Sequence, residues 1–166
     1  TGRVESQLKI GPGQSGLTAT IDSGDLFGRS VASLGDLDGD GVADLAVGAH
    51  GDDDGASNRG AVHVLFLNAD GTVRAEQKIS STSGGLSAAL DDRGRFGYSV
   101  AGLGDLDGDG VVDLAVGAIG DDGGGGGGGA VHILFPTADG TVRAEQKISS
   151  TTVSMPLDPR APAPTP

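Results

Sequence analysis

The sequence contains no cysteine and no tryptophan, and aromatic residues make up only 3% of its 166 positions. Without cysteine there is no disulfide framework, and a thiolate metal site is excluded. The scarcity of aromatic rings means that a core must be built from Val, Leu, Ile and Ala. No run approaches the roughly 18 apolar residues of a transmembrane helix, so membrane insertion is not expected.

Positive charge is also scarce, because 11 Lys and Arg stand against 23 Asp and Glu, for a formal net charge of −12. Nucleic-acid binding normally requires a basic surface, so no nucleic-acid partner is expected. Glycine is abundant, with 32 residues, which favours turns and close strand packing over long helices. Because residue 1 is Thr rather than Met, we expect a mature or trimmed form whose targeting segment has been removed.

The sequence repeats itself with an offset of 69 residues. Residues 27–82 align with 96–151 without a gap, and only twelve of these 56 paired positions differ. A partial copy comes first, because the Val, Lys and Ile of residues 4–10 align with those of 73–79 and 142–148. A repeat this well preserved predicts like units that stack on one another.

Four strand signals follow one another within each repeat. Residues 28–35 and 44–49 are short segments rich in Val, Leu and Ala, bounded by Gly and Asp, and this pattern predicts strands. Residues 60–67 predict a third strand, and residues 72–80 a fourth, after an Asp-Gly hairpin turn. The pattern predicts an all-β protein of two tandem four-stranded antiparallel repeats, similar to propeller blades, each 69 residues long.

An extra strand is expected before the first repeat, over residues 1–10, because this segment copies the last strand of a repeat. The expected organisation is therefore an N-terminal strand and connector forming a partial repeat, two repeats and a Pro-rich tail. The corresponding ranges are 1–26, 27–95, 96–152 and 153–166.

Aspartates recur at fixed spacing in GDLDGDGVADLAVGA (35–49) and in its near-identical copy (104–118). Carboxylates at loop positions 1, 3, 5 and 9, with Gly at position 6, match the front of an EF-hand loop, whose position 7 supplies a backbone carbonyl. The Glu expected at position 12 is replaced by Val47, so Asp44 is expected to close the shell. The apolar run after Asp44 contains Gly48 and favours a strand over the helix of a true EF-hand.

Flexible loops of oxygen ligands select Ca²⁺ over transition metals. We therefore predict one Ca²⁺ per repeat, two per chain, and prefer this interpretation to a solvated acidic turn without metal. The predicted ligands are Asp36, Asp38, Asp40, the Val42 carbonyl and Asp44 in the first repeat, and Asp105, Asp107, Asp109, the Val111 carbonyl and Asp113 in the second.

These motifs resemble FG-GAP repeats, the blades of the integrin alpha-subunit β-propeller, which also occur in many bacterial surface proteins. The matching residues are Phe27-Gly28 and Phe96-Gly97 for "FG", and Gly48-Ala49 and Gly117-Ala118 for "GA". The resemblance implies a calcium loop between the first two strands of a blade and an extracellular or cell-surface location. Two departures stand out: His50 and Ile119 replace the proline of the motif, and the usual propeller has seven blades.

Other polar residues have weaker patterns. Asp52, Asp53, Asp121 and Asp122 lie in polar loops that could bind a cation or a partner, but a solvated loop is the favoured interpretation. For the paired His63 and His132, a packed side chain is favoured over a metal ligand. No catalytic arrangement of Ser, His and Asp stands out, so no enzymatic activity is expected.

Two blades cannot close a propeller, which needs at least four. We therefore expect a calcium-stabilised extracellular structural protein that self-assembles head to tail with copies of itself into a filament, tube or ring. The alternative is a cell-adhesion or ligand-binding module, as a fragment of a larger integrin-like propeller, with glycans or matrix proteins as partners.

Overall fold

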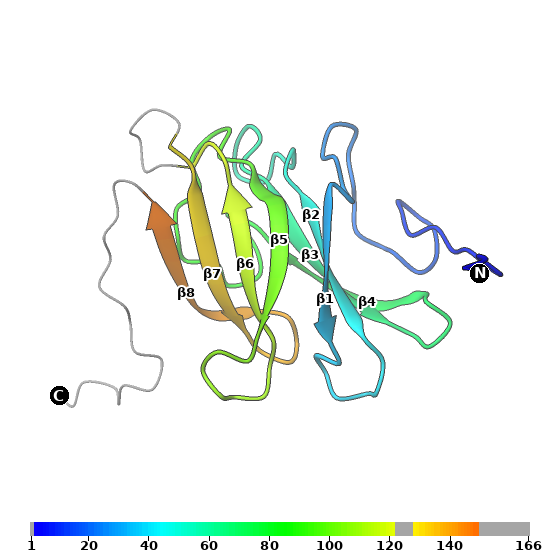
Figure 1. The fold of residues 1–166 in the computed structure, drawn as a ribbon. Helices are drawn as coiled ribbons and strands as arrows, with labels where there is room; N and C mark the ends of the chain where they lie inside the picture. The colour runs from blue at the N-terminus through cyan, green and yellow to red at the C-terminus, as the bar shows by residue number, and fades with distance from the viewer. Residues whose placement is uncertain (1, 122–127, 150–166) are drawn as a thin grey trace.

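The computed structural model describes residues 2–121 and 128–149. Eight strands form two four-stranded antiparallel sheets, each with its strands in chain order (Figure 1). The first sheet holds β1 (Ser30–Gly35), β2 (Asp44–Ala49), β3 (Ala61–Leu67) and β4 (Val73–Ile79); the second holds β5 (Phe96–Gly104), β6 (Asp113–Ala118), β7 (Ala130–Pro136) and β8 (Val142–Ser149). The predicted all-β fold with two blade-like repeats is confirmed. In the described residues no helix has the length and apolarity needed to cross a membrane.

The two sheets repeat the same strand pairing. In the first sheet Ala46 lies opposite Val64, and in the second sheet the equivalent Ala115 lies opposite Ile133. The hairpin between β3 and β4 is closed by hydrogen bonds between residues 68 and 72 and by Gly71, whose φ of 84° suits an Asp-Gly turn. Short hairpins of this kind keep each sheet local in sequence, so each repeat folds its own blade.

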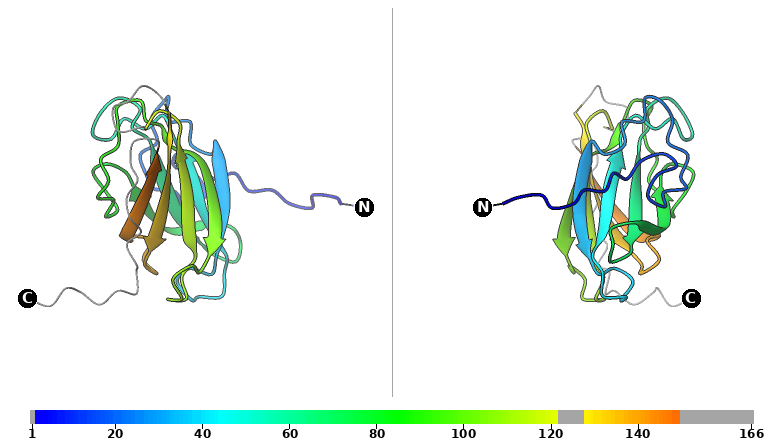
Figure 2. Two further views of the ribbon diagram at one scale, coloured as in Figure 1. Left: turned by 60° about the vertical axis from the view of Figure 1, so that its left-hand side comes forward. Right: turned by 90° about the vertical axis from the view of Figure 1, so that its right-hand side faces the viewer.

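The main core lies between the two sheets, which stack side by side (Figures 1 and 2). The face of the first sheet that carries Val62, Val64 and Ile79 packs against the face of the second sheet that carries Leu114 and Val116. All five side chains are fully buried. The core is aliphatic apart from phenylalanine, as the composition predicts, and each buried side chain of this size contributes about 1.5–3 kcal/mol.

A smaller apolar cluster covers the other face of the first sheet. Leu17, which is 2% exposed, packs there with Val47, Leu65 and Val73. The segment is fixed by a hydrogen bond from the Val73 amide to the Ser15 carbonyl, at 2.7 Å. The connector before the first repeat therefore packs on the sheet that follows it.

The expected strand at the N-terminus is absent. Residues 2–10 pair with no strand, and Val4 and Leu8 are 76% and 51% exposed. The physical reason is that this copy of a fourth strand needs the edge of a third strand, and both third strands in the chain already pair with their own fourth strands. The Pro-rich tail (153–166) lies outside the described residues.

Candidate metal centre

The two aspartate loops lie at the same end of the molecule, where each joins the first two strands of its sheet (Figure 1). Each loop makes a tight turn immediately before a buried strand. Gly41 and Gly110 have φ of 88° and 89°, a backbone conformation that side chains other than Gly rarely adopt. Glycine at position 6 of the motif therefore allows the loop to fold back on its first aspartate.

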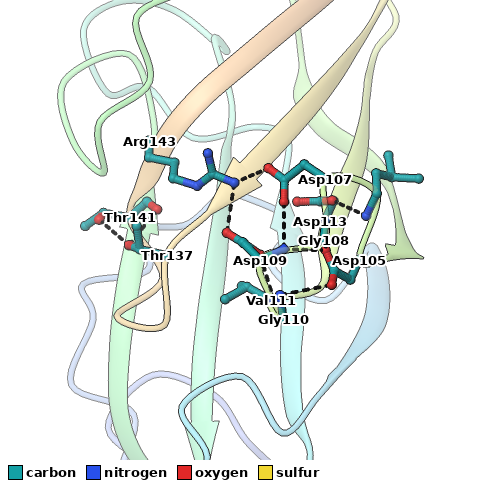
Figure 3. Close-up of polar contacts among 11 residues, drawn as sticks. Asp105, Asp107, Gly108, Asp109, Gly110, Val111, Asp113, Thr137, Thr141 and Arg143 are labelled. Carbon is teal, nitrogen blue, oxygen red and sulfur yellow. Dashed lines mark hydrogen bonds and ion pairs between the residues drawn. The ribbon is translucent and has the colours of Figure 1, made fainter. Parts of the chain in front are cut away.

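The second loop wraps its backbone amides around Asp105 (Figure 3). One oxygen of this carboxylate accepts from the amides of Gly108 and Asp109, at 2.6 and 3.0 Å, and the other accepts from Gly110 at 2.9 Å. Asp107 and Asp109 accept from amides two residues further on, at 3.2 and 2.8 Å. These bonds fix the orientation of all three carboxylates.

The first loop has nearly the same geometry. Asp36 accepts from the Gly41 amide at 2.9 Å, and Asp40 accepts from the Val42 amide at 2.8 Å. In each loop the first three aspartates bring a carboxylate oxygen to within 4.8 Å of one another. Three carboxylates at this separation repel one another strongly unless a cation lies among them.

An arginine from the last strand of each sheet closes the loop from outside. Arg143 bonds Asp107 and also Asp109, the latter at 2.8 Å (Figure 3), and Arg74 bonds Asp38 and Asp40 in the same way. Each guanidinium neutralises part of the charge of two carboxylates. Sequence reasoning missed these contacts, although the arginine recurs at the same place in both TVRAEQ segments.

The last aspartate of each motif is buried beneath its loop and lies outside the group of three. Asp44 and Asp113 are fully buried. Asp44 accepts from the amides of Leu37 and Leu67, both at 3.0 Å, and Asp113 accepts from Leu106 at 2.7 Å. Burial raises the pKa of both carboxyl groups. In the described part of the chain, Oδ1 of Asp113 has no hydrogen-bond partner.

These residues fit a divalent cation with oxygen ligands. The second loop combines three clustered carboxylates with the buried Asp113. Among the described residues Oδ1 of Asp113 has no hydrogen-bond donor, because Pro136 replaces the residue whose amide bonds Asp44 in the first repeat. The negative charges of Asp105, Asp107 and Asp109 also contribute to the raised pKa of Asp113. A bound Ca²⁺ would reverse this penalty, because it would favour the charged form of all four groups. The ligand roles of all ten predicted residues stay predictions, and Asp44, Asp113 and the Val42 and Val111 carbonyls lie outside the group of three carboxylates in each loop.

In the β2–β3 and β6–β7 loops the expectation of solvated aspartates holds for one residue and fails for two. Asp52 and Asp121 are 3% and 0% exposed, so that interpretation is wrong for both, while Asp53 is exposed. Lys78 bonds Asp52 at 2.8 Å, and Lys147 bonds Asp121 at 2.6 Å. An ion pair with a lysine allows each carboxylate to be buried. Asp122 lies outside the described residues.

The two repeated histidines are packed side chains, as expected. His63 and His132 are fully buried, and each meets the Phe of its own FG motif edge to face, with ring centroids 5.5 and 5.3 Å apart. His132 also shares a 2.8 Å hydrogen bond with Asp121. Although burial opposes ionisation, the bonds from His132 and Lys147 keep the pKa of Asp121 below its usual value.

Comparison with known proteins agrees with this architecture. The sequence model of the FG-GAP repeat matches residues 27–65 and 96–134, which hold the first two strands of each sheet, most of the third, and both aspartate loops. Integrin alpha pat-2 of Caenorhabditis briggsae is 38% identical over 121 residues, which are 70% of this chain and 9% of that protein.

Two further relatives are also integrin alpha chains. Integrin alpha-5 of Xenopus laevis is 45% identical over 96 residues, which are 58% of this chain and 9% of that protein. Integrin alpha-2 of Mus musculus is 36% identical over 96 residues, which are 57% of this chain and 8% of that protein. The chain spans less than a tenth of the length of these curated relatives.

Proposed function

Because residues 27–65 and 96–134 are FG-GAP repeats, we propose that this chain forms two neighbouring blades of a calcium-stabilised, extracellular β-propeller-type structure. The observation that carries the proposal is the pair of matching acidic loops at one end of the two sheets. Calcium bound in each loop would hold the turn between the first two strands of a blade, and its role would be structural rather than catalytic.

The chemistry of the loops supports calcium in particular. All of the candidate side-chain ligands are carboxylates, and the loop can supply a backbone carbonyl at position 7. Ca²⁺ accepts six to eight such oxygens in flexible geometry, whereas Mg²⁺ requires a tighter octahedron. Binding would also offset the mutual repulsion of Asp36, Asp38 and Asp40, and of their counterparts, so the folded blade would gain stability from the ion.

Calorimetric titration of the whole chain with CaCl₂ tests this function. We expect two sites with dissociation constants on the order of 10⁻⁴ to 10⁻³ M, as in extracellular modules, and weaker binding of Mg²⁺. Asp109→Asn should leave one site. Asp92→Asn is the matched control, because Asp92 pairs with Arg59 far from both loops, and this variant should keep two. Absence of Ca²⁺ binding by the wild-type chain would refute the proposal.

The integrin alpha relatives suggest that the complete protein takes part in adhesion, with glycans or matrix proteins as its partners. Binding of the chain to arrays of these ligands, in the presence of calcium and of EDTA, tests this part. Head-to-tail self-assembly is a second candidate. A blade pair inside a larger propeller already accounts for the comparisons, so self-assembly rests on the open sheet faces alone.

A further inference from the structure

The junction between the two sheets depends on close backbone contact. The start of β5 lies on the end of the first sheet, where Phe96 pairs with Gly60 in a parallel bridge. A Cβ atom added to Gly48 would lie 2.0 Å from the Gly97 carbonyl oxygen. That oxygen also accepts a hydrogen bond from the Ser30 hydroxyl at 2.9 Å. Gly48 and Gly60 therefore form a groove in the first sheet, and this groove receives the Phe96-Gly97 segment of the next repeat.

The second sheet presents the same groove, and no segment among residues 2–121 and 128–149 covers it. Val62 and Ile79 of the first sheet are fully buried, whereas the equivalent Val131 and Ile148 are 41% and 52% exposed. Ile119, at the rim, is 45% exposed. A cavity of about 390 Å³ lies here, and its lining includes Ser99, Gly117, Ile119, Gly129, Val131 and Ile148. Apart from Ile119, these residue types are identical to those at the covered positions of the first sheet.

The first sheet presents the complementary surface on its opposite face. Val31 is 55% exposed there and lines an apolar cavity of about 190 Å³ with Ile10, Phe27, Gly28 and Leu45, among others. Gly28 and Gly97 share the same backbone conformation, with φ of 85° and 84°. A Cβ atom on Gly97 would lie 2.3 Å from the Ala61 carbonyl, but one on Gly28 would meet nothing within 4 Å. The first Phe-Gly segment thus has the backbone geometry of the second, but in the described part of the chain no neighbouring sheet packs on it.

The connector before each repeat is also prepared for the contact. The Val73 amide bonds the Ser15 carbonyl at 2.7 Å, and the equivalent Val142 amide bonds the Gly84 carbonyl at 2.8 Å. Both connectors therefore pack on the start of the fourth strand of their own repeat. If the first sheet of a second copy docked on the groove of the second sheet, its connector would already pack as the connector of the second sheet packs at the internal junction.

From these surfaces we infer that the groove of the second sheet binds the Phe27-Gly28 segment and β1 face of a second copy of this chain. The contact reproduces the internal junction, so it is heterologous and can propagate head to tail. This inference rests on the proposed function of the repeats as stacking blades, and it names the docking surfaces. Residues 2–10 form no strand, so strand addition by the N-terminus plays no part in this contact.

Two charge substitutions on the opposing faces test the inference. Val131→Asp blocks the groove, and Val31→Asp blocks the complementary face; both side chains are well exposed, so the fold should survive. In calcium, sedimentation of the wild-type chain should show an average mass that rises past that of the dimer as the protein concentration is raised. Each variant alone should remain monomeric, and Val4→Asp is the control that should assemble as the wild type does.

Mixing the two variants gives the decisive result. The groove of the Val31→Asp copy and the Phe-Gly face of the Val131→Asp copy are both intact, so the mixture should form one-to-one dimers that grow no further. This recovery also demonstrates that both variants are folded. A monomeric wild-type chain, or variants that assemble as the wild type does, would overturn the inference. Calcium titration of the same samples separates the outcomes, because a monomer that still binds two ions refutes only the docking.

Discussion

Replacement of Gly48 by alanine should weaken the junction between the two blades. The added methyl group would lie 2.0 Å from the Gly97 carbonyl oxygen and 2.3 Å from the Ser30 hydroxyl oxygen. An ordinary carbon–oxygen contact is about 3.3 Å or longer, so the blades would have to separate by more than about 1 Å. The residues on both sides of Gly97 are held in place, since the Phe96 amide bonds the Arg59 carbonyl at 2.9 Å and the Tyr98 amide bonds the Arg95 carbonyl at 3.1 Å.

The matched variant is Gly117→Ala in the second sheet. Its methyl group would lie 2.3 Å from the Ser99 hydroxyl oxygen, but no backbone atom of another repeat is among its nearest neighbours. A hydroxyl group can rotate, so this substitution should cost about 1 kcal/mol or less, roughly the value of one hydrogen bond. The Gly48 substitution adds a backbone clash, and overpacking of this kind costs about 1–3 kcal/mol. We therefore expect a difference of about 2 kcal/mol between the two variants.

Thermal unfolding in calcium buffer measures this difference. For a chain of this size about 2 kcal/mol corresponds to a Tm difference of roughly 4–8 °C. The protein should be dilute, so that association between copies does not contribute to the Tm. Equal losses for Gly48→Ala and Gly117→Ala would show that the carbonyl of the next repeat does not limit the space at this glycine, and the junction as described would be refuted.

Three further outcomes are expected. Arg143→Gln should tighten calcium binding by roughly threefold to tenfold, because the guanidinium competes with and repels the cation, and should lower the Tm in EDTA; calorimetry and melting curves check both. Asp113→Asn should weaken calcium binding at least about tenfold in the same titration, while the Tm in EDTA stays nearly constant, because the amide oxygen can still accept from Leu106. Burial lowers the pKa of His63 to about 4; since the unfolded side chain takes up its proton near pH 6.5, the free energy of unfolding should fall by up to about 3 kcal/mol between pH 6.5 and 4. Denaturant titrations should show a shallower loss for His63→Leu, and identical pH slopes would contradict the assignment.

The strands and the aspartate loops could be predicted because they depend on local sequence. Residues 44–49 become a strand since their apolar run follows a turn that Gly41 allows, and the 69-residue repeat confirms the pattern independently. The N-terminal strand was predicted wrongly, because a strand needs a free edge to pair with, and the local pattern of residues 1–10 carries no information about that edge.

Long-range charge pairing was also beyond the sequence. Arg143 reaches Asp107 and Asp109 from 34 to 36 positions away, and only the antiparallel order of the strands brings them together. The burial of Asp121 depends on Lys147 and His132, which come from two neighbouring strands. Recurrence of Arg and Lys at equivalent places in both repeats is the signal that could have indicated these contacts.

The shared residues of the covered and uncovered grooves have an evolutionary consequence. A newly duplicated repeat would inherit both halves of the junction, the two groove glycines and the Phe-Gly segment, so it would fit its neighbour without adaptive substitutions. In-frame duplication or loss of one unit can therefore change the length of such a gene product in a single genetic event. Selection on these glycines therefore acts on the junction between repeats. A substitution of one of them in an ancestral unit would be inherited by every repeat copied from that unit.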